Sequence, residues 1–283
     1  MRRIDRIKLD FSRNWRLPGR ERLSNLLKPS SELRSSMKDG IAWCTDENIA
    51  IYTSADSYIE WLILSNGTYE DEINKLIRIS LKPCDNALDI GSNIGLQSLR
   101  MAQCVGIGGN VFSFEPLNYL QEKLRKNISL NRADNVTLFP FALADVNGEI
   151  EFTVNPNSWN QGTFSLAQSG NGTEKQMVSV KVADELPEIS SLPSLQLVKI
   201  DVEGFEYQVM RGLVQTLQKH KPRIIFEYDN NYWVKTGQNI QDCYHFLKEF
   251  NYSLYQIGKV GCQLIRHPEK IVDGNIFCIQ SDI

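Results

Sequence analysis

The chain has 283 residues, a length typical of one large domain or of one domain with an appendage. Hydrophobic residues make up 42% of it and charged residues 23%, which is ordinary globular composition and excludes a largely disordered chain. A formal net charge of −3 argues against a dedicated nucleic-acid-binding protein, and no apolar run is long enough to predict a transmembrane helix.

Positive charge is concentrated at the start of the chain. Residues 1–40 hold eleven Lys and Arg against five Asp and Glu, whereas the remainder is acidic. We interpret residues 1–50 as a basic N-terminal appendage and residues 51–283 as the main domain. The chain starts without the apolar core of a secretory signal, and no two of its six cysteines are closer than 16 residues. We therefore expect a cytoplasmic protein without a cysteine-based metal site.

The main domain alternates between two patterns along the chain. Short apolar or β-branched runs predict strands at residues 87–90, 110–115, 136–141, 197–202, 223–228, 252–257 and 275–280. Helical spacing predicts helices at residues 94–104, 117–131, 205–219 and 240–250. Strands that alternate with helices indicate βαβ units and a mostly parallel, doubly wound sheet, whose last two strands form an antiparallel pair.

One stretch interrupts this alternation. Residues 149–154 and 177–182 each alternate apolar and polar side chains, which predicts two antiparallel strands. Between them, residues 155–173 are rich in Asn, Ser, Gly and Gln. We interpret the stretch as a β excursion with a long loop that faces the substrate as a lid.

The first chemical motif is a glycine turn after the first of these strands. Asp89 ends the strand, and Gly91 and Gly95 bracket the turn into the next helix. Glycine is needed where a backbone turns sharply or approaches a ligand closely, and the N-terminus of a helix attracts electronegative groups. A dinucleotide-binding turn would have glycines where this chain has Asn93 and Leu96, which excludes that fingerprint.

An acidic residue follows the next predicted strand. Glu115 lies 24 residues after Gly91, where a carboxylate can accept hydrogen bonds from the two hydroxyls of a ribose. A glycine turn after one strand and an acid after the next together predict a nucleoside site. Because the pyrophosphate fingerprint is missing, the predicted ligand is a nucleoside without phosphates. S-adenosylmethionine fits this prediction, with its ribose on Glu115 and its ammonium group near Asp89.

Four acidic residues stand at the ends of two further strands of the parallel sheet. Asp201 and Glu203 end one of them, and Glu227 and Asp229 end the next. Ligands of α/β sheets bind outside the carboxyl ends of the strands, so the four side chains are expected to face one cleft. The structural alternative is that Lys199 and Glu203 form a solvated pair and that Asp201 caps the following helix.

Together these motifs resemble the FkbM family of S-adenosylmethionine-dependent methyltransferases. The resemblance extends from about residue 60 to residue 230. It is carried by Leu-Ser-Asn-Gly-Thr-Tyr-Glu, Asp-Ile-Gly-Ser-Asn-Ile-Gly, Phe-Glu-Pro, Asn127 with Asn131, Lys-Ile-Asp-Val-Glu-Gly and Ile-Phe-Glu. It implies a Rossmann-like class I methyltransferase fold with a mostly parallel seven-stranded sheet, an antiparallel terminal strand and the β excursion after the third strand.

The resemblance also implies a cofactor, a reaction and a set of site residues. The cofactor is S-adenosylmethionine, and the reaction is O-methylation of a hydroxyl on a sugar, glycan or polyketide-type molecule; no nucleic-acid partner is expected. The residues that line the cofactor by this resemblance are Glu70, Asp89, Gly91, Asn93, Gly95 and Glu115, with Phe141 and Ala142 near the adenine.

Methyl transfer needs an acceptor oxygen held close to the methyl carbon and a base for the hydroxyl proton. We expect Asp201 or Glu203 to accept that proton, with Glu227 shaping the local field. A divalent metal held by the same oxygens is an alternative that we do not favour. Two other classes of function stay open, namely methylation of protein or nucleic acid and a non-catalytic interaction module that retains the fold.

Overall fold

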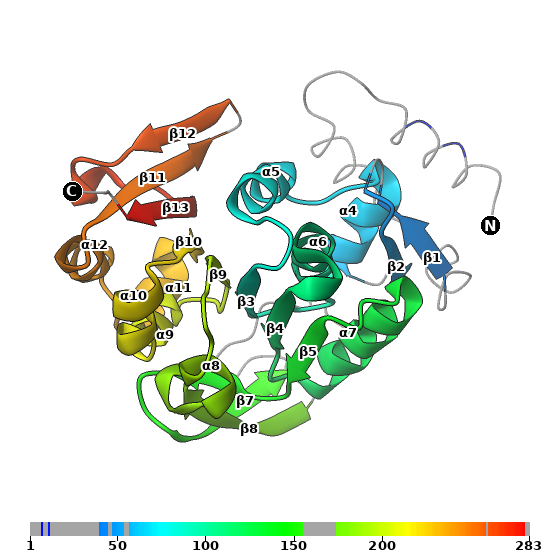
Figure 1. Ribbon diagram of the computed structural model, residues 1–283, viewed down its shortest axis with the longest axis horizontal. Coiled ribbons are helices and arrows are strands. Elements are labelled where there is room, and N and C mark those ends of the chain that lie inside the picture. Colours follow the sequence, from blue (N-terminus) through cyan, green and yellow to red (C-terminus); the bar gives the residue numbers. More distant parts are fainter. Residues whose placement is uncertain are drawn as a thin grey trace.

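The structure of the protein is a computed structural model that describes residues 7, 11, 40–44, 47–53, 57–154, 174–258 and 260–280. Its central feature is an eight-stranded sheet in the order β12-β11-β13-β10-β9-β3-β4-β5 (Figure 1). The strands are β3 (Asn86–Ile90), β4 (Asn110–Phe114), β5 (Val136–Phe139), β9 (Leu197–Ile200), β10 (Arg223–Tyr228), β11 (Tyr252–Gly258), β12 (Gly261–Leu264) and β13 (Gly274–Gln280). The strands from β10 to β5 are parallel, and β13, β11 and β12 extend the sheet in antiparallel pairs.

The predicted α/β architecture is confirmed. Each strand predicted for the sheet is present within two residues of its expected bounds, and β11 and β13 form the expected antiparallel pair. β12 is an additional strand at the edge of the sheet. Its four residues are all exposed, so they have no buried face and hence no apolar alternation that would predict a strand.

Helices cover both faces of this sheet (Figure 1). Those that pack on one face are α4 (Tyr58–Asn66), α5 (Asp71–Ser80), α6 (Leu96–Val105) and α7 (Asn118–Asn131). Those on the other are α8 (Pro187–Ser190), α9 (Glu206–Arg211), α10 (Val214–His220), α11 (Asn230–Lys235) and α12 (Ile240–Glu249). Within the described residues, no helix has both the length and the apolar character needed to cross a membrane.

The central strands separate two apolar cores. Successive side chains of a strand point to opposite faces, so Ala87 packs with the helices of one face and Leu88 with those of the other. All residues of β3 and β9 are buried. This double coverage is the reason that these strands are nearly continuous apolar runs in the sequence.

The helix predicted at residues 205–219 is interrupted. It consists of α9 and α10, and the break falls at Gly212 and Leu213. A Cβ atom on Gly212 would lie 2.2 Å from the carbonyl oxygen of Ala144, which shows how closely this turn approaches a neighbouring segment. The carboxylate of Asp184 accepts hydrogen bonds from the backbone amides of Gln215 and Thr216 at 2.6 and 3.0 Å, and so caps the start of α10.

The β excursion is a separate three-stranded sheet in the order β6-β8-β7. Its strands are β6 (Ala142–Ala144), β7 (Gly148–Val154) and β8 (Glu174–Val182). β7 and β8 are antiparallel, as predicted, and β6 adds a parallel strand that the sequence pattern did not indicate. The loop at residues 155–173, which we expect to act as a lid, lies outside the described residues.

A hairpin near the start of the chain is attached to α7 by two asparagines. Its strands are β1 (Gly40–Trp43) and β2 (Ala50–Thr53). The side-chain oxygens of Asn131 and Asn127 accept hydrogen bonds from the backbone amides of Ala50 and Tyr52, at 2.9 and 2.8 Å. The expected domain boundary at residue 50 falls inside this hairpin, and most of the expected basic appendage lies outside the described residues.

Candidate active site

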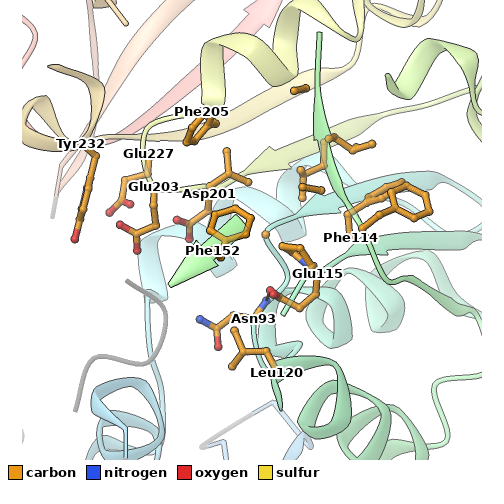
Figure 2. Close-up of a pocket in the computed structure, with 18 of the residues that line it drawn as sticks. Asn93, Phe114, Glu115, Leu120, Phe152, Asp201, Glu203, Phe205, Glu227 and Tyr232 are labelled. Carbon is orange, nitrogen blue, oxygen red and sulfur yellow. Dashed lines mark hydrogen bonds between the residues drawn. The ribbon is translucent and has the colours of Figure 1, made fainter. Parts of the chain in front are cut away.

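A cavity of about 290 Å³ lies at the carboxyl ends of the parallel strands (Figure 2). The residues that follow β3, β4, β9 and β10 form one part of its lining, because parallel strands bring these ends to the same edge of the sheet. Tyr58 and Ile59 of α4 form another part. Ile150 and Phe152 of β7 and Val180 of β8 complete an apolar part of the lining.

The turn after β3 is tight for a reason that the structure makes clear. Gly91 has φ +80°, and a Cβ atom there would lie 1.8 Å from the carbonyl oxygen of Asp201. Its amide donates a hydrogen bond to the carbonyl of Phe114 at 2.9 Å. Gly95, at φ +89°, leaves no room for a Cβ atom beside Leu124. A side chain at Gly91 would collide with the backbone of Asp201, and the positive φ of both residues favours glycine.

Glu115 joins the ends of β3 and β4 inside the cavity lining. Its Oε2 accepts a hydrogen bond from the amide of Asn93 at 2.8 Å, and its Oε1 accepts one from the amide of Leu117 at 2.9 Å. The residue is 2% exposed, and burial raises its pKa to about 8. A carboxylate oxygen can accept two hydrogen bonds and each oxygen of Glu115 accepts one here, so the group retains acceptor capacity for a ligand.

Aromatic side chains line the cavity next to Glu115. Phe114 and Phe141 contribute to the lining, with ring centroids 5.8 Å apart, and Ala142 follows them. The ring of Phe139 stacks on that of Phe114 at 4.9 Å. These rings give the part of the cavity near β4 and β5 a flat, apolar surface.

The buried side chain of Lys199 interacts with carboxylates from three segments of the chain. The Nζ atom of Lys199 lies 3.0 Å from Oδ2 of Asp201 and 3.9 Å from Oδ1 of Asp89. Although burial alone would lower it, the carboxylates of Asp201, Asp89 and Glu70 raise the pKa of Lys199 above its ordinary value. Burial raises the pKa of Glu70 to about 7 and also raises that of Asp89. Lys199 is therefore a charged counter-ion shared by several acids.

Glu203 and Glu227 lie beside Asp201 at the other end of the cavity, next to Tyr232 (Figure 2). Burial and the neighbouring Asp201 raise the pKa of Glu203 to about 9. Repulsion from Asp201, followed by burial, raises the pKa of Glu227 to about 10. The Oε2 atom of Glu203 is fully buried and has no hydrogen-bond partner among the described residues. Because no Lys, Arg or His is among the described residues that line the cavity, Glu203 and Glu227 stay mostly protonated near neutral pH.

The loop that carries Glu203 is held by an acid to which sequence reasoning gave no role. Glu206 accepts hydrogen bonds from the amide of Val202 at 2.9 Å and from that of Gly204 at 3.0 Å. Glu203 itself has φ 53°, a left-handed conformation that is unfavourable for a residue with a side chain. Local strain of this kind is maintained only when surrounding contacts fix it, and here the Glu206 carboxylate provides them.

Most of the predicted site residues line this cavity, and three of them do not. Those that line the cavity are Gly91, Asn93, Glu115, Phe141, Ala142, Asp201, Glu203 and Glu227. Glu70, Asp89 and Gly95 are not among the lining residues; Glu70 and Asp89 approach Lys199, and Gly95 begins α6. Asp229, also predicted for the cleft, lines it while capping α11 through its side chain.

Sequence reasoning missed Tyr69 and the apolar side chains of β7 and β8. Tyr69 lines the cavity. It belongs to the Leu-Ser-Asn-Gly-Thr-Tyr-Glu stretch and directly precedes Glu70, so that stretch could have indicated it as a site residue. Residues 149–154 and 177–182 were predicted as antiparallel strands with no place assigned to their apolar side chains, and only the fold shows that some of these side chains line the cavity. In the described part of the chain, no three His, Cys, Asp or Glu side chains are grouped as metal ligands.

Comparison with known proteins identifies similar sequences. A family model described as the methyltransferase FkbM domain matches residues 89–254. The chain is 31% identical over 150 residues to the hexuronic acid methyltransferase AglP of Haloferax volcanii, a match covering 53% of this chain. It is 26% identical over 158 residues to the 2-O-methyltransferase NoeI of Sinorhizobium fredii, a match covering 51% of this chain.

These matches cover part of each protein. The chain spans 58% of the length of the Haloferax protein and 64% of that of the Sinorhizobium protein. Among solved structures, the methyltransferase FkbM of Methylobacillus flagellatus aligns with a TM-score of 0.44 at 12% identity. That alignment covers 92% of this chain and 60% of the other.

Proposed function

Because the chain belongs to the FkbM methyltransferase family, we propose that it transfers the methyl group of S-adenosylmethionine to a hydroxyl oxygen of a sugar-containing acceptor. The names of two relatives, one for hexuronic acid and one for 2-O-methylation, support a sugar hydroxyl as the acceptor group. One observation carries the proposal: the glycine turn after β3 and Glu115 after β4 line the same cavity as the carboxylates after β9 and β10.

The chemistry of the cavity fits the cofactor. Gly91 lines the cavity at the turn, and Glu115 has lone pairs available for two ribose hydroxyls. Phe141 and Ala142 offer an apolar surface suited to adenine. When bound, S-adenosylmethionine supplies an electrophilic methyl group on a sulfonium. Asp201, the acid beside Lys199 that lines the cavity, suits the positive charges of its methionine end.

We assign the role of general base to Glu203. Oδ2 of Asp201 already accepts a hydrogen bond from Lys199 at 3.0 Å, whereas Oε2 of Glu203 has no partner among the described residues. Glu203 lines the cavity, and its raised pKa makes its carboxylate a stronger base than an ordinary glutamate. With cofactor and acceptor bound, this carboxylate would accept the hydroxyl proton while the acceptor oxygen takes the methyl group and the methyl–sulfur bond breaks, leaving a neutral thioether.

The apolar lining contributes by excluding water. Ile150, Phe152 and Val180 of the excursion present aliphatic and aromatic atoms to the cavity. Water kept away from the reacting atoms neither hydrates the acceptor oxygen nor weakens the electrostatic interactions of the carboxylates. Holding the acceptor in one orientation supplies a further part of the rate, since positioning is worth about 7–11 kcal/mol in favourable cases.

The proposal is tested by substituting Glu115. Hydrogen bonds to a charged group are worth about 1.5–3 kcal/mol, so Glu115→Ala is expected to weaken binding of S-adenosylhomocysteine by about tenfold to a hundredfold. Isothermal titration calorimetry measures this directly. Glu115→Gln, which retains one carbonyl oxygen, is expected to lose less affinity and controls for disturbance of the turn.

A matched control is Glu188→Gln, which removes an exposed carboxylate on α8 away from the cavity lining and is expected to leave affinity unchanged. Unchanged affinity in Glu115→Ala would remove this residue from the cofactor site and contradict the proposal. Failure of the unsubstituted protein to bind S-adenosylhomocysteine at all would instead favour a non-catalytic module. Ligand at about 100 times Kd would stabilise a binding protein by about 2.7 kcal/mol, which thermal unfolding detects.

A further inference from the structure

The helix α11 packs directly on the loop that carries Glu203. Gly204, the next residue of this loop, has φ +101°, and a Cβ atom there would lie 2.8 Å from the carbonyl oxygen of Tyr232 and 3.0 Å from its Cβ. The hydroxyl of Thr236 donates a hydrogen bond to the carbonyl of Gly204 at 2.7 Å. Tyr232 and Thr236 are four residues apart, so they lie on the same face of the helix. This face of α11 holds the loop immediately beside Glu203.

The rest of α11 is fixed by the core of the protein. Trp233 is 1% exposed, and its ring lies 5.3 Å from that of Tyr228 and 6.2 Å from that of Phe226, measured between centroids. The side chain of Asp229 caps the first turn of the helix. Because Tyr232 directly precedes the anchored Trp233, the fold sets its position before any ligand binds.

The side chain of Tyr232 interacts with the carboxylate of Glu203. Both residues line the cavity, and Figure 2 shows their side chains next to each other at one end of it. Burial is the main cause of the raised pKa of Glu203, and a hydrogen bond with the side chain of Tyr232 opposes this effect. Burial, followed by the charge of Glu203 and the same hydrogen bond, raises the pKa of Tyr232. The phenol therefore keeps its proton and is the donor, and the carboxylate is the acceptor.

The other side chains around Glu203 act in the opposite direction. Four acids face it from neighbouring segments, namely Asp201 after β9, Glu206 of α9, Glu227 at the end of β10 and Asp229 before α11. Repulsion from the first, second and last of these raises the pKa of Glu203, and Glu203 in turn raises that of Glu227. The buried cation Lys199 is bonded to Asp201 at 3.0 Å. Tyr232 is thus the neighbour on α11 that favours the ionised form of Glu203, the form that a general base needs.

We propose that Tyr232 is a positioning residue for Glu203, whose carboxylate it orients toward the acceptor hydroxyl by donating a hydrogen bond. The inference rests on the proposed function and adds a residue to the proton-accepting end of the same site. Glu206 holds the backbone of the loop through the amides of Val202 and Gly204. The base is therefore fixed twice, at its backbone by Glu206 and at its carboxylate by Tyr232.

The first test measures the ionisation of Glu203 directly. Tyr232→Phe removes the hydroxyl and keeps the ring, and the matched control Tyr244→Phe removes a hydroxyl on α12, away from the cavity lining. Glu203 is titrated by NMR in protein with isotope-labelled glutamate, and its signal is assigned with Glu203→Gln. Loss of a donor to the ionised carboxylate is expected to raise the midpoint by about one pH unit in Tyr232→Phe. Tyr244→Phe should keep the midpoint of the unsubstituted protein.

The second test measures the rate, which separates orientation of the base from a merely structural role. Formation of S-adenosylhomocysteine is followed with methyl glucoside as the acceptor. In Tyr232→Phe, kcat should fall about tenfold below about pH 8, and its rising limb should move up by about one pH unit. KM should change less than about twofold, because the ring is retained. Thr236→Val should shift the midpoint and kcat in the same direction by a smaller amount, and Thr236→Ser, which retains the hydroxyl, should restore both.

An unchanged midpoint in Tyr232→Phe would overturn the inference, as would a lower rate whose pH profile does not move. If Tyr232→Phe did not fold, as judged by circular dichroism, an unchanged midpoint and kcat in Thr236→Val would overturn it instead. The failure of the proposed function is distinguishable, because it would appear as loss of S-adenosylhomocysteine binding by the unsubstituted protein. The titration of Glu203 in the free protein does not depend on that binding.

Discussion

At the scale of a single residue, the protonation of Glu203 makes the rate of the proposed reaction depend on pH. A general base must be deprotonated to accept a proton, and burial beside Asp201 raises the pKa of Glu203 to about 9. Below that pH most of the free protein holds Glu203 in its protonated, inactive form. The active fraction therefore increases as the pH rises toward the pKa.

We predict that kcat/KM increases about tenfold per pH unit below about pH 8 and levels off near about pH 9, since kcat/KM reports ionisations of the free enzyme. The assay measures formation of S-adenosylhomocysteine with a neutral glycoside, whose own charge is constant over this range. Glu203→Gln should lower kcat by about a hundredfold or more and abolish the rising limb.

Glu203→Asp provides a control, because it retains a carboxylate at a shorter reach and should keep the rising limb at a reduced rate. A flat profile in the unsubstituted protein would show that proton removal by a high-pKa carboxylate does not limit the reaction. If Glu203→Gln kept both the rate and the slope, the base would have to be another residue of the cluster.

At the scale of secondary-structure elements, Asn127 connects the N-terminal hairpin to the turn of the site. It is fully buried; its side-chain oxygen accepts from the amide of Tyr52 at 2.8 Å, and its side-chain nitrogen donates to the carbonyl of Ile94 at 2.8 Å. Asn127→Ala would leave two buried backbone groups unpaired. We predict a loss of about 2–4 kcal/mol in the free energy of unfolding, measured by urea denaturation monitored by circular dichroism.

Lys126→Ala is the matched control, because it changes the exposed neighbouring position on α7 and should alter stability by less than about 0.5 kcal/mol. A loss below about 0.5 kcal/mol in Asn127→Ala as well would mean that the hairpin is not held through this side chain. A larger loss accompanied by unchanged affinity for S-adenosylhomocysteine would confine the effect to folding.

The elements also show what a sequence can and cannot predict. The strands of the parallel sheet were predictable because both of their faces are covered, which makes β3 and β9 apolar throughout. The break between α9 and α10 was not, because it depends on the close approach of Gly212 to Ala144 and on a cap from Asp184. Both partners are remote in the sequence, so no local pattern reports them.

The site also has features that the sequence predicts and features that only the fold shows. Motif order predicted which strand ends would meet, because the carboxyl ends of parallel strands share one edge. It did not predict that Asp89 lies beneath the cavity against Lys199 or that Glu206 fixes the loop of Glu203. Such roles depend on backbone conformation, including the left-handed φ of 53° at Glu203, which residue type alone does not indicate.

At the scale of the whole molecule, the buried acids couple stability to pH. Burial raises the pKa of Glu206 to about 7, of Glu115 to about 8 and of Glu203 to about 9. Each of these values lies above the ordinary glutamate value of 4.5 that the unfolded chain has. Between the two values the folded state binds more protons than the unfolded state. The contribution of these groups to the free energy of unfolding is therefore largest at low pH and is lost as the pH rises through the folded-state values.

We predict that the Tm of the ligand-free protein falls by about 5 °C or more between about pH 6 and about pH 9. Glu227→Gln should reduce this fall, because it removes a carboxylate whose pKa is raised to about 10. Glu188→Gln should keep the full fall, since that carboxylate is exposed. Repeating the scans at about 0.5 M salt separates buried from surface charge, because salt screens exposed groups far more strongly. A Tm that stayed constant or rose over this range would show that the acids of the cavity are balanced in the folded chain.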